Sequence, residues 1–110
     1  MKKATLVVLT KPVEGREDEY NEWYTGRHLD DVLQVPGFVA AQRFRMVGEP
    51  LEGATWPYCA LYQIEHEDLG EAISGLVARR DTEVLPISSA LDQENMSVIL
   101  YEPITELKTA

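Results

Sequence analysis

The sequence is poor in basic residues and nearly lacks cysteine. Ten lysines and arginines stand against nineteen aspartates and glutamates, which gives a formal net charge of −9 over 110 residues. A nucleic-acid-binding protein needs a surplus of basic side chains to neutralise phosphates, so that class of function is excluded. The single cysteine, Cys59, cannot form an intrachain disulfide or a cysteine-rich metal site. Because it lies in an apolar alternating run, we expect a buried packing residue and a reducing, cytoplasmic location.

Long apolar runs and the common catalytic motifs are also missing. No run approaches the roughly 18 to 20 apolar residues that span a bilayer, so we expect no membrane partner. Residues 1–10 are too short a run for a signal peptide and end at Lys11-Pro12, which favours a first strand. No glycine-rich phosphate loop or G-x-S-x-G elbow occurs. The two histidines, His28 and His66, lack ligand spacing, so we expect no metal, and His66 is expected at an exposed strand-to-helix junction.

The patterns that are present predict six elements in the order βαββαβ, within one domain over 1–110. Alternating apolar residues predict strands over 4–10, 38–47, 58–65 and 95–101. An acidic segment over 14–22 opens a first helix, which must end before Pro36. A second helix begins after Glu67 and Asp68, with an inward stripe of Leu69, Ala72, Ile73, Leu76 and Arg80. The residues after Pro103 are expected to be loosely held.

This order predicts an α+β fold of the ferredoxin-like type, an antiparallel sheet with both helices on one face. Apolar residues occupy both the odd and the even positions of the strands. The sheet face that the helices leave uncovered is therefore too apolar to be exposed to water. A second copy covering that face would give an isologous homodimer, whereas the alternative is a monomer whose 48–57 loop and tail cover it. On the strand over 38–47, strict alternation places Phe38 and Phe44 on one face and Arg43 and Arg45 on the other.

The candidate chemistry lies on the first helix. Residues spaced by three or four positions share one side of a helix: Tyr20, Tyr24, Arg27, His28 and Asp31. A stripe that faces a sheet is normally aliphatic, so this one predicts a helix that passes from core into a polar cleft. His28 can exchange a proton near neutrality. The helix end and Asp31 favour its charged form and burial favours its neutral form, so both directions stay open, as does a role in capping the helix.

Arginine and aromatic side chains on the strands could complete a site. Either Arg43 or Arg45 could face the cleft and hold a carboxylate or enolate oxygen, and a surface ion pair is the alternative. The hydroxyl of Tyr62 could orient a substrate, or its ring could simply pack in the core. Trp56 lies in the loop that could rim the pocket.

Together these residues resemble the dimeric α+β barrel superfamily, and within it the EthD-like group. The resemblance rests on Trp23-Tyr24-x-x-x-His28, on Val35-Pro36-Gly37-Phe38 and on Ala41-x-Arg43-Phe44. It implies a homodimer with a small-molecule cleft between sheet and helices, into which His28 points. Relatives include cofactor-free monooxygenases of polyketide-like phenols, polyketide cyclases and dehydratases, muconolactone-type isomerases and haem enzymes. The chain departs from the pattern after the histidine, where Leu29 stands in place of a frequent proline.

The resulting hypothesis is a cofactor-independent enzyme that acts on an aromatic or polyketide-like molecule by proton transfer, as a lyase, isomerase, cyclase or monooxygenase. His28 is the expected general acid/base, Tyr24 positions the substrate and Arg43 steadies an oxyanion. The expected substrate-binding residues are Trp23, Phe44 and Tyr62. Aromatic compound catabolism is the expected setting. Two alternatives remain: a non-catalytic or stress-related protein that binds a small metabolite, and a haem-binding member of the same fold.

Overall fold

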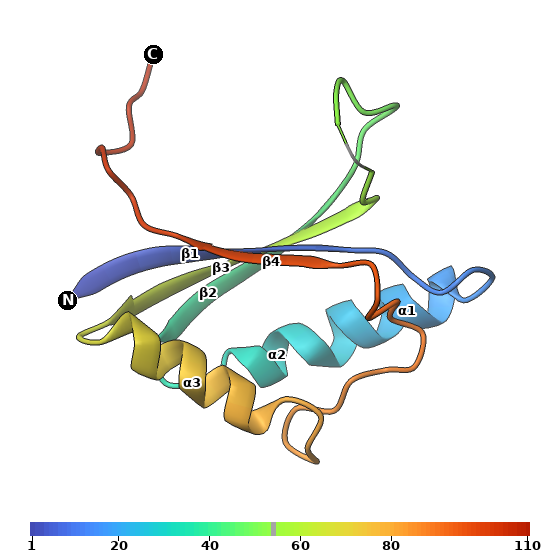
Figure 1. The fold of residues 1–110 in the computed structure, drawn as a ribbon, viewed down its shortest axis with the longest axis horizontal. Coiled ribbons are helices and arrows are strands. Elements are labelled where there is room, and N and C mark those ends of the chain that lie inside the picture. The colour runs from blue at the N-terminus through green and yellow to red at the C-terminus, as the bar shows by residue number, and fades with distance from the viewer. Residues whose placement is uncertain (54) are drawn as a thin grey trace.

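The computed structural model describes residues 1–53 and 55–110, and its elements follow the predicted order (Figure 1). The first helix has three consecutive parts, of which the middle one is a π-helical turn labelled η1. In chain order the elements are β1 (Lys2–Thr10), α1 (Glu17–Trp23), η1 (Tyr24–His28), α2 (Leu29–Val32), β2 (Phe38–Arg45), β3 (Tyr58–His66), α3 (Leu69–Arg79) and β4 (Ser97–Tyr101). Over the described residues, no helix is long and apolar enough to cross a membrane.

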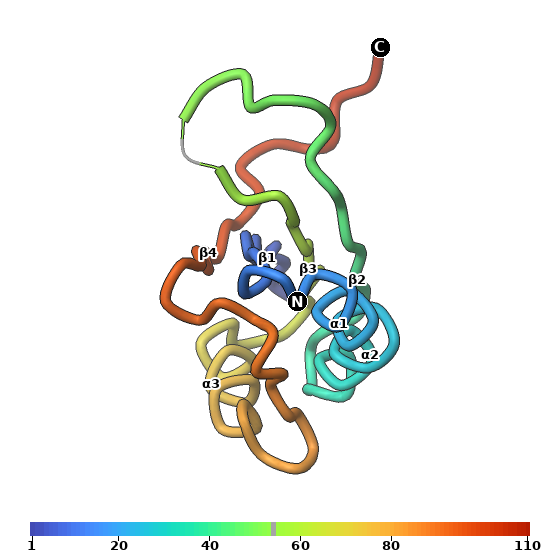
Figure 2. The backbone as a smooth tube through the Cα atoms, turned by 90° about the vertical axis from the view of Figure 1, so that its right-hand side faces the viewer, coloured from blue at the N-terminus to red at the C-terminus, as the bar shows by residue number. Residues whose placement is uncertain are grey.

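The four strands form one antiparallel sheet in the order β2-β3-β1-β4. β1 and β3 pair along their whole length, from Lys2 opposite His66 to Thr10 opposite Tyr58. Both helical segments lie on the same side of the sheet, α1 and α2 over one half and α3 over the other (Figure 2). The predicted ferredoxin-like α+β fold is confirmed.

The core lies between this inner face of the sheet and the helices. Alternate side chains of the two central strands are buried there: Ala4, Leu6, Val8, Thr10, Tyr58, Ala60, Tyr62 and Ile64. The helices contribute Tyr20, Tyr24, Val32 and Ala72, and the segment after α3 contributes Leu85, Ala90 and Leu91. Period-two burial on the strands and i, i+4 burial on the first helix are what the two backbone geometries require.

A β-bulge changes the predicted faces of β2. Phe38 pairs with Ile64 but Ala40 pairs with Gln63, so one extra residue, Val39, lies between them. Phe38 therefore faces the helices and is 4% exposed, whereas Phe44 lies on the opposite face and is 43% exposed. The prediction that the two phenylalanines share a face is wrong, because it assumed strict alternation and the sequence pattern does not reveal an inserted residue.

The outer face of the sheet carries apolar side chains beside polar ones such as Thr5, Gln42 and Gln63, and it lies away from every helix of the described chain (Figure 2). Phe44, Ile99 and Tyr101 are 43%, 46% and 54% exposed there. Cys59, expected to be buried, is half-buried on the same face. The described residues of the 46–53 loop and of the 102–110 tail are exposed, so the structure does not support their covering this face.

The Val35-Pro36-Gly37-Phe38 motif forms the tight connection from α2 into β2. Gly37 has a φ of +96°, in the left-handed region that favours glycine. Its carbonyl accepts the backbone N–H of Glu65 at 2.8 Å. A Cβ at this position would lie 2.9 Å from Cδ2 of His66, so the turn packs directly against the end of β3. His66 lies at the strand-to-helix junction as predicted, but it is half-buried and not exposed, and its Nδ1 accepts the N–H of Asp68.

We expect Gly37→Ala to lower the free energy of unfolding by about 1 to 3 kcal/mol more than Gly15→Ala. Both glycines have positive φ, but a Cβ at Gly15 meets no atom within 4 Å, so this control carries only the backbone strain. Urea titration of both variants measures the difference. Equal losses would show that the contact with His66 is not tight.

Candidate active site

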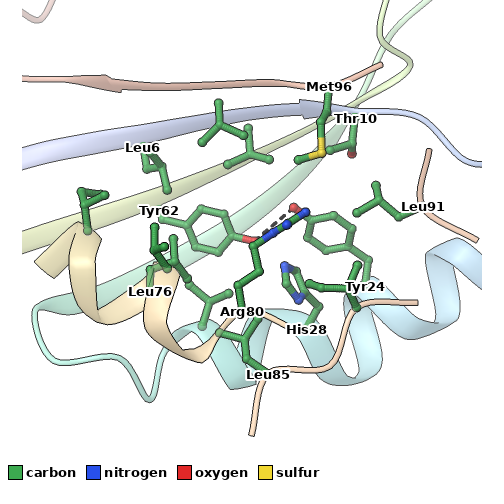
Figure 3. Close-up of a pocket in the computed structure, with 16 residues that line it drawn as sticks. Leu6, Thr10, Tyr24, His28, Tyr62, Leu76, Arg80, Leu85, Leu91 and Met96 are labelled. Atoms are coloured by element: carbon green, nitrogen blue, oxygen red, sulfur yellow. Dashed lines mark hydrogen bonds between the residues drawn. The ribbon is translucent and has the colours of Figure 1, made fainter. Parts of the chain in front are cut away.

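A cavity of about 340 Å³ lies between the inner face of the sheet, the first helix, α3 and the segment that follows α3 (Figure 3). Its volume falls in the range of roughly 300 to 1,000 Å³ that is usual for small-molecule sites. Most of the wall is aliphatic, with Leu6, Val8, Val32, Ile73, Leu76, Leu85, Ile87, Leu91, Met96 and Val98 among the lining residues. Five side chains bring polar groups to it: Thr10, Tyr24, His28, Tyr62 and Arg80.

A π-helical turn positions two of these polar residues. At its end the N–H of Leu29 bonds the carbonyl of Tyr24, five residues back, which widens the helix by one residue per turn. Tyr24 and His28 then face the cavity, whereas Arg27 pairs with Asp31 at 3.0 Å on the exposed side. The predicted single stripe containing Arg27 and Asp31 is therefore partly wrong.

The imidazole of His28 lies against two aromatic rings. Its centroid is 4.5 Å from that of Trp23 and 4.8 Å from that of Tyr24, which meets it edge-on. Its Nδ1 is buried and has no hydrogen-bond partner in the described part of the chain. A capping role through Nδ1 is therefore not supported. Nε2 is not among the buried atoms without a partner, so it is the ring nitrogen that remains open to the cavity.

Burial sets the protonation state of His28. It lowers the pKa of the imidazole to about 4; the carboxylate of Asp31 opposes this shift, and the positive charges of Arg80 and Arg43 add to it. At neutral pH the side chain is therefore a neutral imidazole. Such a group accepts a proton and does not supply one at the start of a reaction.

Two buried phenols lie beside this histidine. The hydroxyl of Tyr62 donates to that of Tyr24 at 3.1 Å (Figure 3). Burial raises the pKa of Tyr24 to about 12 and raises the pKa of Tyr62 as well, so both remain protonated. Because Tyr62 supplies the proton of their shared bond, the proton of the Tyr24 hydroxyl is available to an acceptor in the cavity.

Arg43 lies behind Tyr24 and does not line the cavity. Its guanidinium carbon is 4.5 Å from the centroid of the Tyr24 ring and also packs against the rings of Tyr20 and Tyr58. Its terminal nitrogens donate to Asn21 Oδ1 and Thr25 Oγ1, each at 2.9 Å. This geometry does not support the expected contact with substrate. Through these contacts Arg43 instead stabilises the position of the first helix on the sheet.

Of the three predicted substrate-binding residues, only Tyr62 lines the cavity. Trp23 packs against His28 without lining the cavity, and Phe44 lies on the outer face of the sheet. The indole of Trp23 donates to the carbonyl of Pro86 at 3.3 Å. Trp56, the expected rim residue, donates to the carbonyl of Asn95 and is not among the lining side chains.

Arg80 lines the cavity, although it was predicted only as an inward-facing helix residue and not as part of the site. It follows α3, and its guanidinium donates to Gln93 Oε1 at 2.8 Å. The available signal was its place four residues after Leu76 on the inward stripe of the second helix, where a cation replaces an aliphatic side chain. Arg80 is the only permanently charged side chain that lines the cavity in the described chain.

The donor set does not fit a haem well. A haem brings two propionates, and this cavity offers a single permanent cation, Arg80. The imidazole of His28 is also packed between the rings of Trp23 and Tyr24, which leaves it little freedom to turn toward an iron. Among the described residues, no three His, Cys, Asp or Glu side chains gather as a metal-binding group.

No known protein-family profile matches the chain. A curated relative, core atranone cluster protein 1 of Stachybotrys chlorohalonatus, is 37% identical over 62 residues, which are 54% of this chain. The match spans only 25% of that relative's length. Among solved structures, an EthD-like protein of Ralstonia eutropha superposes with a TM-score of 0.68 at 12% identity, covering 97% of this chain and 96% of that one.

Further solved structures share the fold. A protein described as a proposed monooxygenase from Shewanella loihica has a TM-score of 0.65 at 19% identity, covering 94% of this chain and 96% of the other. The haem degrader MhuD of Mycobacterium tuberculosis, with two haems in its active site, has a TM-score of 0.61 at 16% identity, with 96% and 99% covered. A dimeric ferredoxin-like protein from Jannaschia has a TM-score of 0.60 at 16% identity, with 92% and 99% covered. The chain thus has the fold of the EthD-like, dimeric ferredoxin-like proteins.

We expect the folded protein to lose stability through His28 as the pH falls from about 6.5 to about 4. In that window the unfolded chain binds a proton at His28 that the folded chain excludes, so acid favours unfolding by up to about 3 kcal/mol. His28→Gln should lack this component. Urea titrations of both proteins across the window measure the difference, and NMR should find the His28 ring neutral down to about pH 4. A midpoint near 6.5 would contradict the burial argument.

Proposed function

We propose that this protein is a cofactor-independent enzyme that removes a proton from an aromatic or polyketide-like small molecule, with His28 as the general base. The observation that carries the proposal is a neutral imidazole at the wall of an apolar cavity, with no hydrogen bond to the described part of the chain. A titratable group whose pKa is strongly perturbed by burial, and that lies in a cavity, is a candidate for chemistry.

The phenols supply the second half of the chemistry. As His28 takes a proton, negative charge grows on an oxygen of the substrate. The free hydroxyl proton of Tyr24 can bond that oxygen, while Tyr62 fixes Tyr24 through their 3.1 Å bond. The growing anion in turn favours the imidazolium, so the pKa of His28 rises during the step that needs it to hold a proton.

An enolate or phenolate is a common first intermediate of isomerases, cyclases, lyases and cofactor-free oxygenases. The aliphatic wall suits a ring system with few polar groups. A proposed monooxygenase and a haem degrader share the fold, which supports small-molecule chemistry without naming the reaction. A protein that only binds a metabolite could use the same wall, and conversion separates the two functions.

We also propose that the working form is a homodimer joined through the outer face of the sheet. Phe44, Ile99 and Tyr101 are about half-exposed there, in a contiguous apolar surface beside Leu61 and Cys59. Burying this surface against its own copy gives a closed, self-complementary interface. The dimeric ferredoxin-like neighbour supports the same arrangement.

His28→Ala should lower kcat by about 10²- to 10⁴-fold, since it removes the base while leaving the outer face intact. Hydroxylated naphthalenes and hydroxycoumarins would be screened by thermal shift, and each hit incubated and analysed for products by mass spectrometry. His66→Ala, a histidine outside the cavity, is the matched control and should keep full turnover. Hits that bind wild type without conversion would favour the binding protein over the enzyme.

Ile99→Asp should convert the dimer to a monomer, because it introduces a charge into the apolar surface of the outer face, on the edge strand β4. Val84→Asp makes a similar change on an exposed site of the helix-side segment and should leave the dimer intact. Light scattering coupled to size exclusion measures both masses. A monomeric wild type, or a dimer that survives Ile99→Asp, would refute the proposed interface.

A further inference from the structure

We propose that Arg80 makes the cavity selective for a ring-shaped ligand that carries one acidic enol or phenol group, whose oxyanion pairs with the guanidinium. This inference rests on the proposed function, because it assigns the substrate class of the same cavity. It gives the charge-pairing role to a helix-terminal arginine in place of Arg43.

Arg80 lies at the wall of the cavity. It comes just after the last residue of α3, and its charge acts on His28. Among the lining side chains there is no carboxylate, and the remainder of the wall is aliphatic, phenolic or imidazole. Arg80 is exposed and Asp31 also acts on His28, but Arg80 is the one lining cation of the described residues with which an incoming anion can pair.

Arg80 has no acidic partner in the described chain, a property that it shares with three of the other five arginines. In a chain with a net charge of −9, Arg16 pairs with Glu19 and Arg27 pairs with Asp31. Over the described residues Arg80 has no ion pair, and its one side-chain hydrogen bond goes to the neutral amide oxygen of Gln93. A guanidinium has five N–H donors, so most of its capacity is unused.

Arg80 is also coupled to His28. Burial is the main cause of the neutral imidazole; Asp31 opposes it, and the charge of Arg80 favours it. The pair is a neutral base beside a fixed cation. When the ligand's O–H or activated C–H gives its proton to the imidazole of His28, the electron pair of the broken bond stays on the ligand oxygen or is delocalised onto it, and Arg80 offsets that charge. Attraction between the two charges is stronger beside an apolar wall than in water.

A purely structural role is the competing explanation. The bond between Arg80 and Gln93 joins α3 to the segment before β4, and it could serve only to hold that segment. If Arg80 only holds that segment in place, its substitution should lower the affinity for neutral and acidic ligands alike. If Arg80 selects for charge, its substitution should lower only the affinity for the acidic ligand.

The experiment compares 4-hydroxycoumarin, an acidic enol that is ionised at pH 7.5, with its neutral methyl ether, 4-methoxycoumarin, by calorimetric titration. We expect wild type to bind the acid about tenfold more tightly than the ether. Arg80→Gln should remove that preference by weakening only the acid, and Arg80→Lys should retain part of it. Arg79→Gln is the matched control, since Arg79 bonds the carbonyl of Gly75 and lies outside the cavity lining.

An unchanged preference in Arg80→Gln, an equal loss for both ligands, or no binding of either ligand to wild type would overturn the inference. The readout is binding alone, so it is independent of turnover. If His28→Ala left turnover intact while Arg80→Gln abolished the preference, the proposed base would be wrong and the selectivity of Arg80 would stand.

Discussion

The ring of Tyr24 is the contact on which the site depends. One face receives the guanidinium of Arg43 at 4.5 Å, the imidazole of His28 meets the ring edge-on at 4.8 Å, and the hydroxyl accepts a bond from Tyr62. These contacts fix where the first helix sits on the sheet. Because the ring is buried, it also contributes to the apolar environment that keeps His28 neutral. Removing it would disturb the base, the hydrogen-bond donor and the helix contact together.

The fold was accessible from the sequence because burial on strands and helices has a regular period. Alternation located the four strands, and the Val35-Pro36-Gly37-Phe38 turn separated helix from strand. The sequence pattern did not predict two one-residue irregularities, the bulge at Val39 and the π-helical turn at 24–28. Each leaves its strand or helix in place but changes the direction of the side chains that follow. Phe44 was therefore assigned to the wrong face, and Arg27 was grouped with His28.

The site was predictable in part for the same reason. Tyr62 lies on a regular inward position of β3, and Tyr24 and His28 keep an inward direction within the π-helical turn; all three line the cavity. Arg43 also faces inward, yet three tyrosine rings and two polar side chains of the first helix hold its guanidinium behind Tyr24. Only the tertiary packing decides that Arg80, from the other helix, reaches the cavity instead. The position of a charge along one element does not reveal which neighbours will surround it.

The most direct test is the protonation state of His28 with and without an acidic ligand. Nitrogen chemical shifts of ¹⁵N-histidine-labelled protein at pH 7 distinguish a neutral ring from an imidazolium. The account predicts a neutral ring in the free protein, because burial holds its pKa near 4. When ionised 4-hydroxycoumarin fills the cavity, its negative charge raises the pKa of His28, and the account predicts an imidazolium that takes its proton from solvent. An imidazolium in the free protein, or a neutral ring that saturating ligand leaves unchanged, would contradict it.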